Sequence, residues 1–137
     1  MIYAVIDTNV LVSALLTSKS DTATVQVIEA FLNGQIIPLY NEEIINEYEI
    51  VLNRPAFHFS EEKVNLYISS IRQKGLLASR IPSNFEFPDS DDAVFYEVAL
   101  SKEDAYVITG NLKHFPKTPI VVTPAEMIAI LSEYITQ

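Results

Sequence analysis

The sequence of 137 residues contains no cysteine and only two histidines, His58 and His114. These absences exclude disulfide bonds, thiolate catalysis, zinc–thiolate sites and any metal site that is rich in histidine. No apolar run reaches the length that a membrane-spanning helix needs. No basic segment precedes the first apolar run, so we expect no signal peptide, no membrane partner and a cytoplasmic protein.

Basic residues are also scarce, because nine lysines and arginines stand against 18 aspartates and glutamates, for a net charge of −9. This charge argues against broad electrostatic binding of nucleic acid, which depends on many contacts between cations and phosphates. Chemistry on nucleic acid would therefore need a local basic patch or a metal ion. The remaining composition, 49% hydrophobic and 20% charged, is that of an ordinary globular protein. The length predicts one domain over residues 1–137.

The first notable stretch is the apolar run at residues 2–6, which ends at Asp7, Thr8 and Asn9. A short run without polar alternation predicts a strand that is buried on both faces, as in a parallel sheet. Open α/β sheets bind ligands at the carboxyl edge of their strands, so Asp7 would lie at the rim of a crevice. Aspartate, threonine and asparagine are also good helix N-caps, so this stretch alone leaves capping as an equal alternative.

Apolar periodicity and capping residues predict that helices and strands alternate along the rest of the chain. The predicted strands are residues 36–40, 76–81, 105–109 and 120–122, and the predicted helices are residues 10–16, 22–33, 42–52, 61–74, 93–100 and 125–134. Pro38 leaves the pairing of the second strand in doubt. Alternation of this kind predicts an α/β fold in which a parallel sheet is layered between helices.

Carboxylate and amide side chains recur where predicted strands end and where predicted helices begin. They are Asp7 and Asn111 after two strands, Glu47 on helix 42–52, and Asp89, Asp91 and Asp92 before helix 93–100. Because the carboxyl ends of parallel strands face the same side, we expect these side chains to meet. Oxygen ligands without histidine or cysteine favour Mg²⁺ or Mn²⁺, which can activate water and stabilise charge on a phosphoryl group. The set predicts metal-dependent hydrolysis of a phosphodiester or phosphoester.

Each of these residues also has a structural alternative. Asp91 can serve only as a helix cap, and Asp92 can serve only as a partner of the helix dipole. Glu47 can be a solvated helix residue, and Asn111 can be a turn residue in the left-handed conformation. His114 is too isolated to indicate a catalytic base, and an ordinary loop histidine is the simpler interpretation.

Four motifs, in a consistent order and spacing, carry a resemblance to a known family. They are residues 6–14 (IDTNVLVSA), 47–52 (EYEIVL), 89–92 (DSDD) and 108–115 (ITGNLKHF). Together they resemble the PIN-domain family, and most closely its VapC-like branch of toxins from toxin–antitoxin pairs. The likeness extends along nearly the whole chain, through residues 123–127.

This resemblance implies a Mg²⁺- or Mn²⁺-dependent endoribonuclease on a three-layer α/β/α sandwich with a central parallel sheet. By position, Asp7, Glu47 and Asp92 match the acidic triad that holds metal, and Asp91 competes for the third place. Asn111 falls where many relatives have a fourth acid, which predicts weaker metal affinity and leaves a second metal ion in doubt. The resemblance also implies an RNA substrate, a cognate antitoxin protein and a homodimer.

The resemblance also implies roles for residues that support the acidic triad. Thr109 matches a hydroxyl beside the site, and Asn9 matches a polar residue that orients Asp7. From charge alone, the basic residues expected to hold phosphates are Lys113, Arg72, Lys74 and Arg80.

Two other functions stay open on the sequence. A PIN-like module that binds RNA or protein but cleaves little is suggested by Asn111 and by the net charge of −9. A phosphatase of the haloacid-dehalogenase type is suggested because Asp7 ends a first strand. That chemistry needs a second acid two residues later, and Asn9 stands there.

Overall fold

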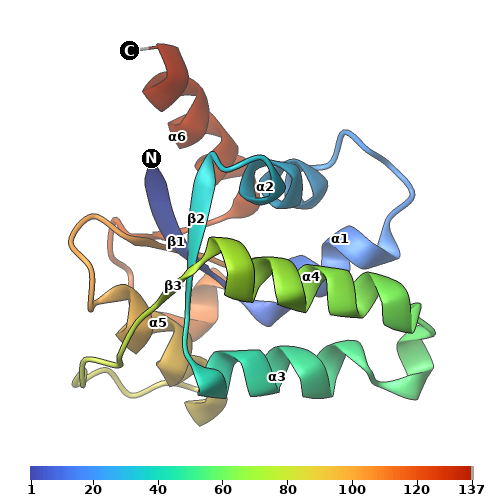
Figure 1. Cartoon of the computed structure of the whole chain (residues 1–137). Coiled ribbons are helices and arrows are strands. Elements are labelled where there is room, and N and C mark those ends of the chain that lie inside the picture. Colours follow the sequence, from blue (N-terminus) through green and yellow to red (C-terminus); the bar gives the residue numbers. More distant parts are fainter. Residues whose placement is uncertain (137) are drawn as a thin grey trace.

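A computed structural model describes residues 1–136 and contains a five-stranded, all-parallel sheet with helices packed around it (Figure 1). The strands are β1 (Ile2–Ile6), β2 (Ile36–Tyr40), β3 (Leu76–Leu77), β4 (Tyr106–Ile108) and β5 (Val121–Val122). The helices are α1 (Thr8–Leu16), α2 (Ala23–Leu32), α3 (Glu42–Leu52), α4 (Glu61–Lys74), α5 (Ala93–Ala99) and α6 (Pro124–Thr136). The predicted α/β architecture is confirmed.

Local signals account for most of the helix boundaries. The side chains of Asn41 and Ser60 cap α3 and α4 by accepting hydrogen bonds from backbone N–H groups in the first turn. The strand predicted at residues 76–81 is wrong in length, because β3 has only two residues. The chain leaves the sheet there, and the N–H of Ile81 instead donates to the carbonyl of Glu97 in α5. This bond satisfies one of the carbonyls that a helix end leaves without an internal partner.

The strand order is β3-β2-β1-β4-β5. From β1 the chain adds β2 and β3 on one side, and it then crosses to add β4 and β5 on the other side. The direction of winding therefore reverses between β1 and β4, where Ile6 lies opposite Ile108. Such a switch point opens a crevice at the carboxyl ends of the two strands. Asp7 and Thr109 are the residues that follow β1 and β4 directly.

Pro38 does not confine β2 to an edge, because β2 pairs with both β1 and β3. Pro38 lies opposite Ala4 at the last paired position with β1, and the pairing with β3 begins at Leu39. The proline therefore stands where the pairing passes from one neighbour to the other, where a missing N–H disrupts the ladder least.

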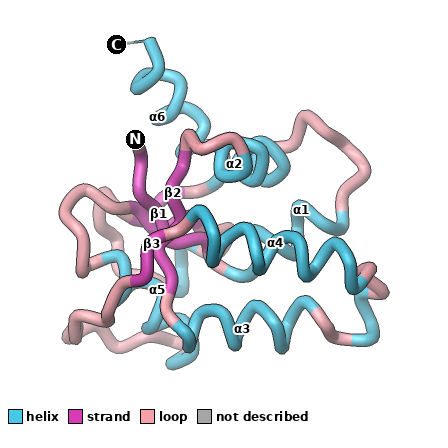
Figure 2. The backbone as a smooth tube through the Cα atoms, in the orientation of Figure 1, coloured by secondary structure: helices cyan, strands magenta, loops and turns pink. Residues whose placement is uncertain are grey.

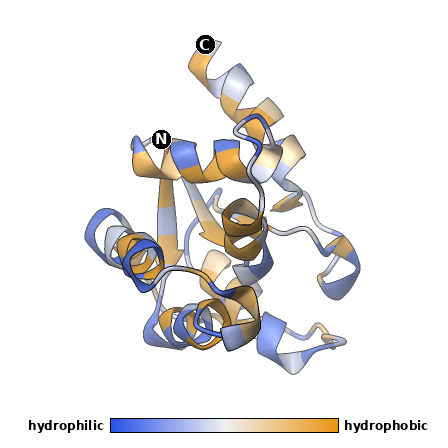
Figure 3. Cartoon of the chain, turned by 90° about the vertical axis from the view of Figure 1, so that its right-hand side faces the viewer, coloured by the Kyte–Doolittle hydropathy of each residue, from blue (hydrophilic) through white to orange (hydrophobic). Residues whose placement is uncertain are grey.

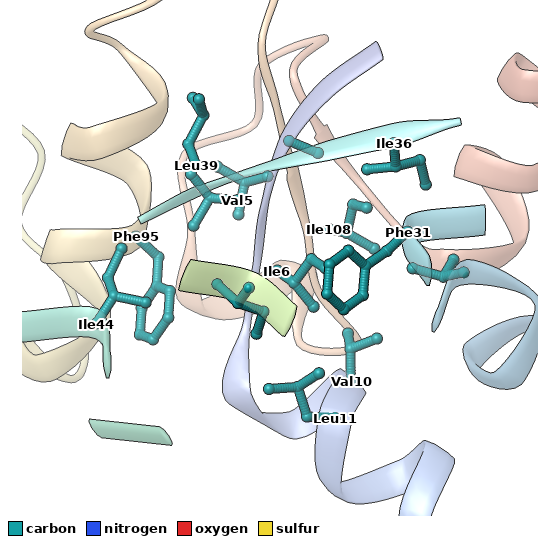
Figure 4. Close-up of a cluster of buried hydrophobic side chains, with 14 of the residues drawn as sticks. Val5, Ile6, Val10, Leu11, Phe31, Ile36, Leu39, Ile44, Phe95 and Ile108 are labelled. Atoms are coloured by element: carbon teal, nitrogen blue, oxygen red, sulfur yellow. The ribbon is translucent and has the colours of Figure 1, made fainter. Parts of the chain in front are cut away.

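The central strands are covered on both faces, which explains why they are apolar without alternation. Val5, Ile6 and Ile108 are fully buried. Figure 4 shows Phe31 of α2 and Phe95 of α5 on opposite sides of β1, within one continuous cluster of buried side chains. Figure 3 shows hydrophobic residues gathered in the interior and hydrophilic residues on the outer sides of the helices. None of the helices in residues 1–136 is both long enough and apolar enough to cross a bilayer.

The segment between β3 and α5 carries the acidic motif, and Figure 2 shows it as a long loop without strands. Phe87 anchors this loop, because its ring centroid lies 6.0 Å from those of both Tyr96 and Phe115. The anchor fixes the chain two residues before Asp89. The acidic motif is thereby held against the body of the protein rather than left in a free loop.

Candidate active site

Asp7 is delivered by β1 to the carboxyl edge of the sheet, and its side chain is only 4% exposed. It stands at the N-cap position of α1, yet its side chain makes no capping hydrogen bond. Instead, Oδ2 of Asp7 accepts hydrogen bonds from Nδ2 of Asn9 at 2.9 Å and from the hydroxyl of Thr109 at 2.7 Å. Capping therefore does not explain the presence of this carboxylate.

The two partners of Asp7 are themselves oriented by backbone groups. The hydroxyl of Thr109 accepts a hydrogen bond from the N–H of Asn111 at 3.0 Å, so its own proton is directed to Asp7. Oδ1 of Asn9 accepts from the N–H of Gly110 at 3.2 Å, which turns the amide nitrogen towards Asp7. These bonds join the segment after β1 to the segment after β4. Asn9 and Thr109 thus hold the orientation of the Asp7 carboxylate.

Asp7 lines a pocket of about 310 Å³ that lies beside α1, α3 and the start of α5. The charged and amide side chains from the predicted set that share this pocket are Asp7, Glu47, Asp89, Asp92 and Asn111. The structure therefore brings together residues from four separate segments of the chain. Glu49, two residues further along α3 than Glu47, is exposed and outside the pocket.

The two candidates for the third acid are placed differently. Asp89 caps a 3-10 turn (Ser90–Asp92) by accepting a hydrogen bond from the N–H of Asp91 at 3.0 Å. This turn runs directly into α5, so that Asp92 faces the pocket while Asp91 is exposed and lines a separate hollow with Arg80. The pocket therefore contains Asp92 and not Asp91.

His114, which the sequence suggested to be an ordinary loop histidine, also lines the pocket. It ends a 3-10 turn (Leu112–His114), and its Nδ1 lies 3.2 Å from Oδ2 of Asp92. A single histidine carries no periodic signal, and its position three residues after Asn111 was the one available indication. Asn111 itself has φ −118° and ψ 69°, so the alternative of a left-handed turn residue does not apply.

The carboxyl groups of the pocket are electrostatically coupled. Burial raises the pKa of Asp7 to about 6, and the charge of Asp92 adds to this rise, whereas the hydrogen bond from Thr109 opposes it. Burial and the charge of Asp89 raise the pKa of Asp92, while His114 lowers it. Burial and then the charge of Asp91 raise the pKa of Glu47. Such shifts are typical of carboxylates that share a pocket, and a cation would reverse them.

The oxygen donors of the pocket match the chemistry of a divalent cation. All of them are hard oxygens, which suit Mg²⁺ or Mn²⁺. In addition, Thr8 lines the pocket, and its buried Oγ1 has no hydrogen-bond partner among the described residues. Within residues 1–136, however, no three histidine, aspartate or glutamate side chains lie close enough to hold an ion as they stand. The pocket is a ring of oxygen donors rather than a preformed coordination sphere.

Two of the basic residues expected to hold phosphates form ion pairs elsewhere. Arg72 binds Glu42 through both terminal guanidinium nitrogens, at 2.8 and 2.9 Å. Arg80 bridges Glu43 and Glu97, with nitrogen–oxygen distances of 2.8 Å to each. Neither arginine lines the carboxylate pocket.

The lysines are also placed apart from the acids. The amino group of Lys74 donates to the backbone carbonyl of Leu32. Lys113 lines two hollows, one of which adjoins the pocket through Asn111 and His114. The cation that does line the carboxylate pocket is Arg54, which sequence reasoning passed over.

Comparison with known families places the chain. A family model described as PIN domain matches residues 3–113, a range that includes Asp7, Glu47, Asp92 and Asn111. No curated protein matches the sequence. PIN domains are a superfamily of nucleases that generally use divalent metal ions, and the parallel sheet flanked by helices is consistent with their fold. The chain belongs to the PIN-domain family.

Proposed function

We propose that this protein is an endoribonuclease that hydrolyses RNA phosphodiester bonds and depends on Mg²⁺ or Mn²⁺. The observation that carries the proposal is the meeting of Asp7, Glu47, Asp92 and Asn111 in one pocket at the switch point of the sheet. Membership of a superfamily of nucleases supports it. Asp7, Glu47 and Asp92 would hold the ion, and Asn111 would add a neutral oxygen ligand.

Hydrogen bonds hold the carboxylates of this pocket in place. Asn9 and Thr109 fix the orientation of Asp7, and His114 contacts the carboxylate of Asp92. With a pKa of about 6, Asp7 is mostly ionised at neutral pH and is available as a ligand. A bound Mg²⁺ or Mn²⁺ supplies an activated water and neutralises the charge that develops on the phosphoryl oxygens. Because Asn111 is an amide, it brings no negative charge to that ion.

We test the proposal by calorimetric titration with Mn²⁺, with RNA cleavage measured on the same samples. The wild type and the Asp21→Asn variant, which alters an exposed acid outside the pocket, are expected to bind Mn²⁺ and to cleave RNA. The Asp7→Asn variant is expected to lose both properties. Metal-dependent cleavage that survives in Asp7→Asn would show that the assignment is wrong, as would a wild type that binds no Mn²⁺ at millimolar concentration.

The proposal includes a biological role as the toxin of a toxin–antitoxin pair, with a cognate antitoxin and a homodimeric state. Its support is the resemblance of the four motifs to the VapC-like branch. Expression of the wild type in a bacterial host is expected to arrest growth, whereas Asp7→Asn is not. Co-expression of the protein encoded by the neighbouring gene should restore growth, and unimpaired growth with the wild type alone would contradict the role.

A second candidate function is a PIN-like module that binds RNA or protein with little cleavage. The observation that favours it is that no three acidic or histidine side chains in residues 1–136 stand close enough to hold an ion. This function predicts RNA binding without cleavage in the calorimetric samples. A haloacid-dehalogenase-type phosphatase has less support, because Asn9 fills the place of the second acid and is engaged with Asp7 and Gly110.

A further inference from the structure

Arg54 is the arginine that forms no ion pair within the described chain. The sequence has three arginines, and the other two form ion pairs with glutamates. Arg54 is exposed, lines the carboxylate pocket, and makes no ion pair or side-chain hydrogen bond within residues 1–136. The same pocket is lined by Glu47, Asp89 and Asp92, so the guanidinium lies among acids. An unpaired cation at an acidic pocket is suited to a phosphate.

Phe57 lines the same pocket and is only half-buried. Its ring stacks on that of Phe59, with centroids 5.0 Å apart and planes inclined by 11°. Phe59 thus covers one face of the Phe57 ring, and the pocket adjoins the rest of it. The partly exposed Phe57 ring therefore lies beside a set of carboxylates and is held in place by Phe59.

A rigid turn brings the arginine and the aromatic ring together. Arg54 precedes a 3-10 turn (Pro55–Phe57), in which Pro55 presets the backbone. The N–H of Phe57 donates to the carbonyl of Arg54 at 3.1 Å. Both residues line the same pocket, so their side chains share one side of the turn. In Figure 1 this turn joins the ends of α3 and α4 that lie farthest from the sheet.

The lining of the pocket extends from the acids towards this turn. Glu47 and Val51 lie one helical turn apart on α3, and Arg54 and Phe57 follow them along the chain. The pocket therefore has an acidic end at Asp7 and an end formed by a cation and an aromatic ring. A polyanionic chain with flat bases matches these two ends of the pocket. Its reacting phosphate can lie at the acidic end while a neighbouring nucleotide lies at the turn that carries Arg54 and Phe57.

We propose that Arg54 and Phe57 form a subsite for one unpaired nucleotide of an RNA substrate, in which Arg54 binds a phosphate and Phe57 stacks on the base. This inference rests on the proposed nuclease function for the position of the reacting phosphate. Proteins commonly bind single-stranded nucleic acid with arginines, which contact the phosphate backbone, and with aromatic rings, on which the bases stack. A base must leave its helix to stack on a protein ring, so the subsite selects single-stranded RNA over a duplex.

The test measures binding in an Asp7→Asn background, so that the probe remains intact. The probe is a short fluorescein-labelled, single-stranded oligoribonucleotide of mixed sequence, and a second version carries 2-aminopurine to report stacking. Phe57→Ala is expected to weaken binding by roughly 5- to 100-fold and to remove the quenching of 2-aminopurine. Arg54→Gln is expected to lower the slope of log affinity against log salt by about 0.7, which corresponds to one phosphate contact on a single strand.

Further variants separate stacking from a structural role. Phe57→Leu keeps an apolar side chain and should still lose the quenching, whereas Phe57→Tyr should retain both quenching and affinity. The matched controls are Phe85→Leu, which alters an exposed ring outside the pocket, and Lys102→Gln. Lys102 lies 4.2 Å from the ring centroid of Tyr3, a residue near the amino end of β1 and so at the opposite edge of the sheet. Both controls should bind RNA as their parent does.

The outcomes distinguish this subsite from the nuclease function. Loss of affinity in the Arg54 and Phe57 variants supports the subsite, whether or not the protein cleaves RNA. If the protein with Asp7 restored cleaves no RNA, only the nuclease proposal fails. Unchanged affinity and salt slope in both variants overturn the subsite, even if the chain is an active nuclease. Equal affinity for a duplex competitor, or no binding of the probe by the parent, also overturns it.

Discussion

The hydroxyl of Thr109 donates a hydrogen bond to Oδ2 of Asp7 at 2.7 Å, although 102 positions of sequence separate the two residues. The contact is possible because β1 and β4 are neighbours in the sheet and end at the same level, with Ile6 opposite Ile108. Both side chains are buried, and the same hydroxyl accepts the N–H of Asn111. One threonine therefore links two other residues of the candidate active site, Asp7 and Asn111.

Thr109→Val should destabilise the protein, because valine keeps the shape of threonine but removes this link. Asp7 would lose a donor and the N–H of Asn111 would lose an acceptor, which predicts a loss of about 1–3 kcal/mol in the free energy of unfolding at neutral pH. Urea denaturation measures this loss. Thr109→Ser keeps the hydroxyl and is the control, with an expected loss of about 1 kcal/mol for the missing methyl group. If serine proves as damaging as valine, packing rather than the hydrogen bonds is responsible.

Asp7→Asn should stabilise the protein above pH 6 in the presence of a chelator. The pKa of Asp7 is about 6 in the folded protein, above its ordinary value of 3.8, so the folded state binds more protons between these values. Stability therefore falls as pH rises from about 4 to about 6, and this contribution stays lost above that range. The shift corresponds to about 3 kcal/mol, which Asp7→Asn would recover. Urea denaturation at about pH 4 and about pH 8 should show the two proteins converging at the acidic end, and a constant difference would contradict the prediction.

Asp92→Asn should weaken Mn²⁺ binding, whereas Asp91→Asn should leave it nearly unchanged. The two residues are adjacent in sequence, but only Asp92 lines the pocket with Asp7. Loss of a charged oxygen ligand is expected to lower the affinity at least about tenfold in calorimetric titration. The neighbouring variant is a matched control for charge and position. A larger loss in Asp91→Asn than in Asp92→Asn would reverse the assignment of the third acid.

Asn111→Asp should raise the affinity for Mn²⁺, because it adds a negative charge to the set of oxygen donors. The same change should destabilise the protein in a chelator, since another carboxylate then shares the pocket with Asp7, Glu47 and Asp92. Melting temperatures with chelator and with Mn²⁺ measure both effects. The spread between the two temperatures should be wider than in the wild type, and an identical spread would show that position 111 lies too far from the ion to matter.

Local patterns in the sequence were sufficient for the elements and for most of their boundaries. The strand at residues 2–6 and the helices at residues 42–52 and 61–74 were predicted and are present. These features depend on side chains and backbone groups only a few residues apart, so neighbours along the chain encode them. The shortening of β3 was not predictable in this way, because it depends on the bond from Ile81 to distant Glu97.

The candidate site was predictable as a set of residue types but not as an arrangement. The sequence alone determined that hard oxygen donors follow the strands and precede a helix, since the residues at strand ends and helix starts can be identified from local pattern. The tertiary structure decided that Asp92 rather than Asp91 joins Asp7, that glutamates neutralise Arg72 and Arg80, and that Arg54 faces the pocket. Side chains share a pocket or an ion pair only after crossover connections bring distant segments together, and the resulting burial and charge depend on all of those segments at once.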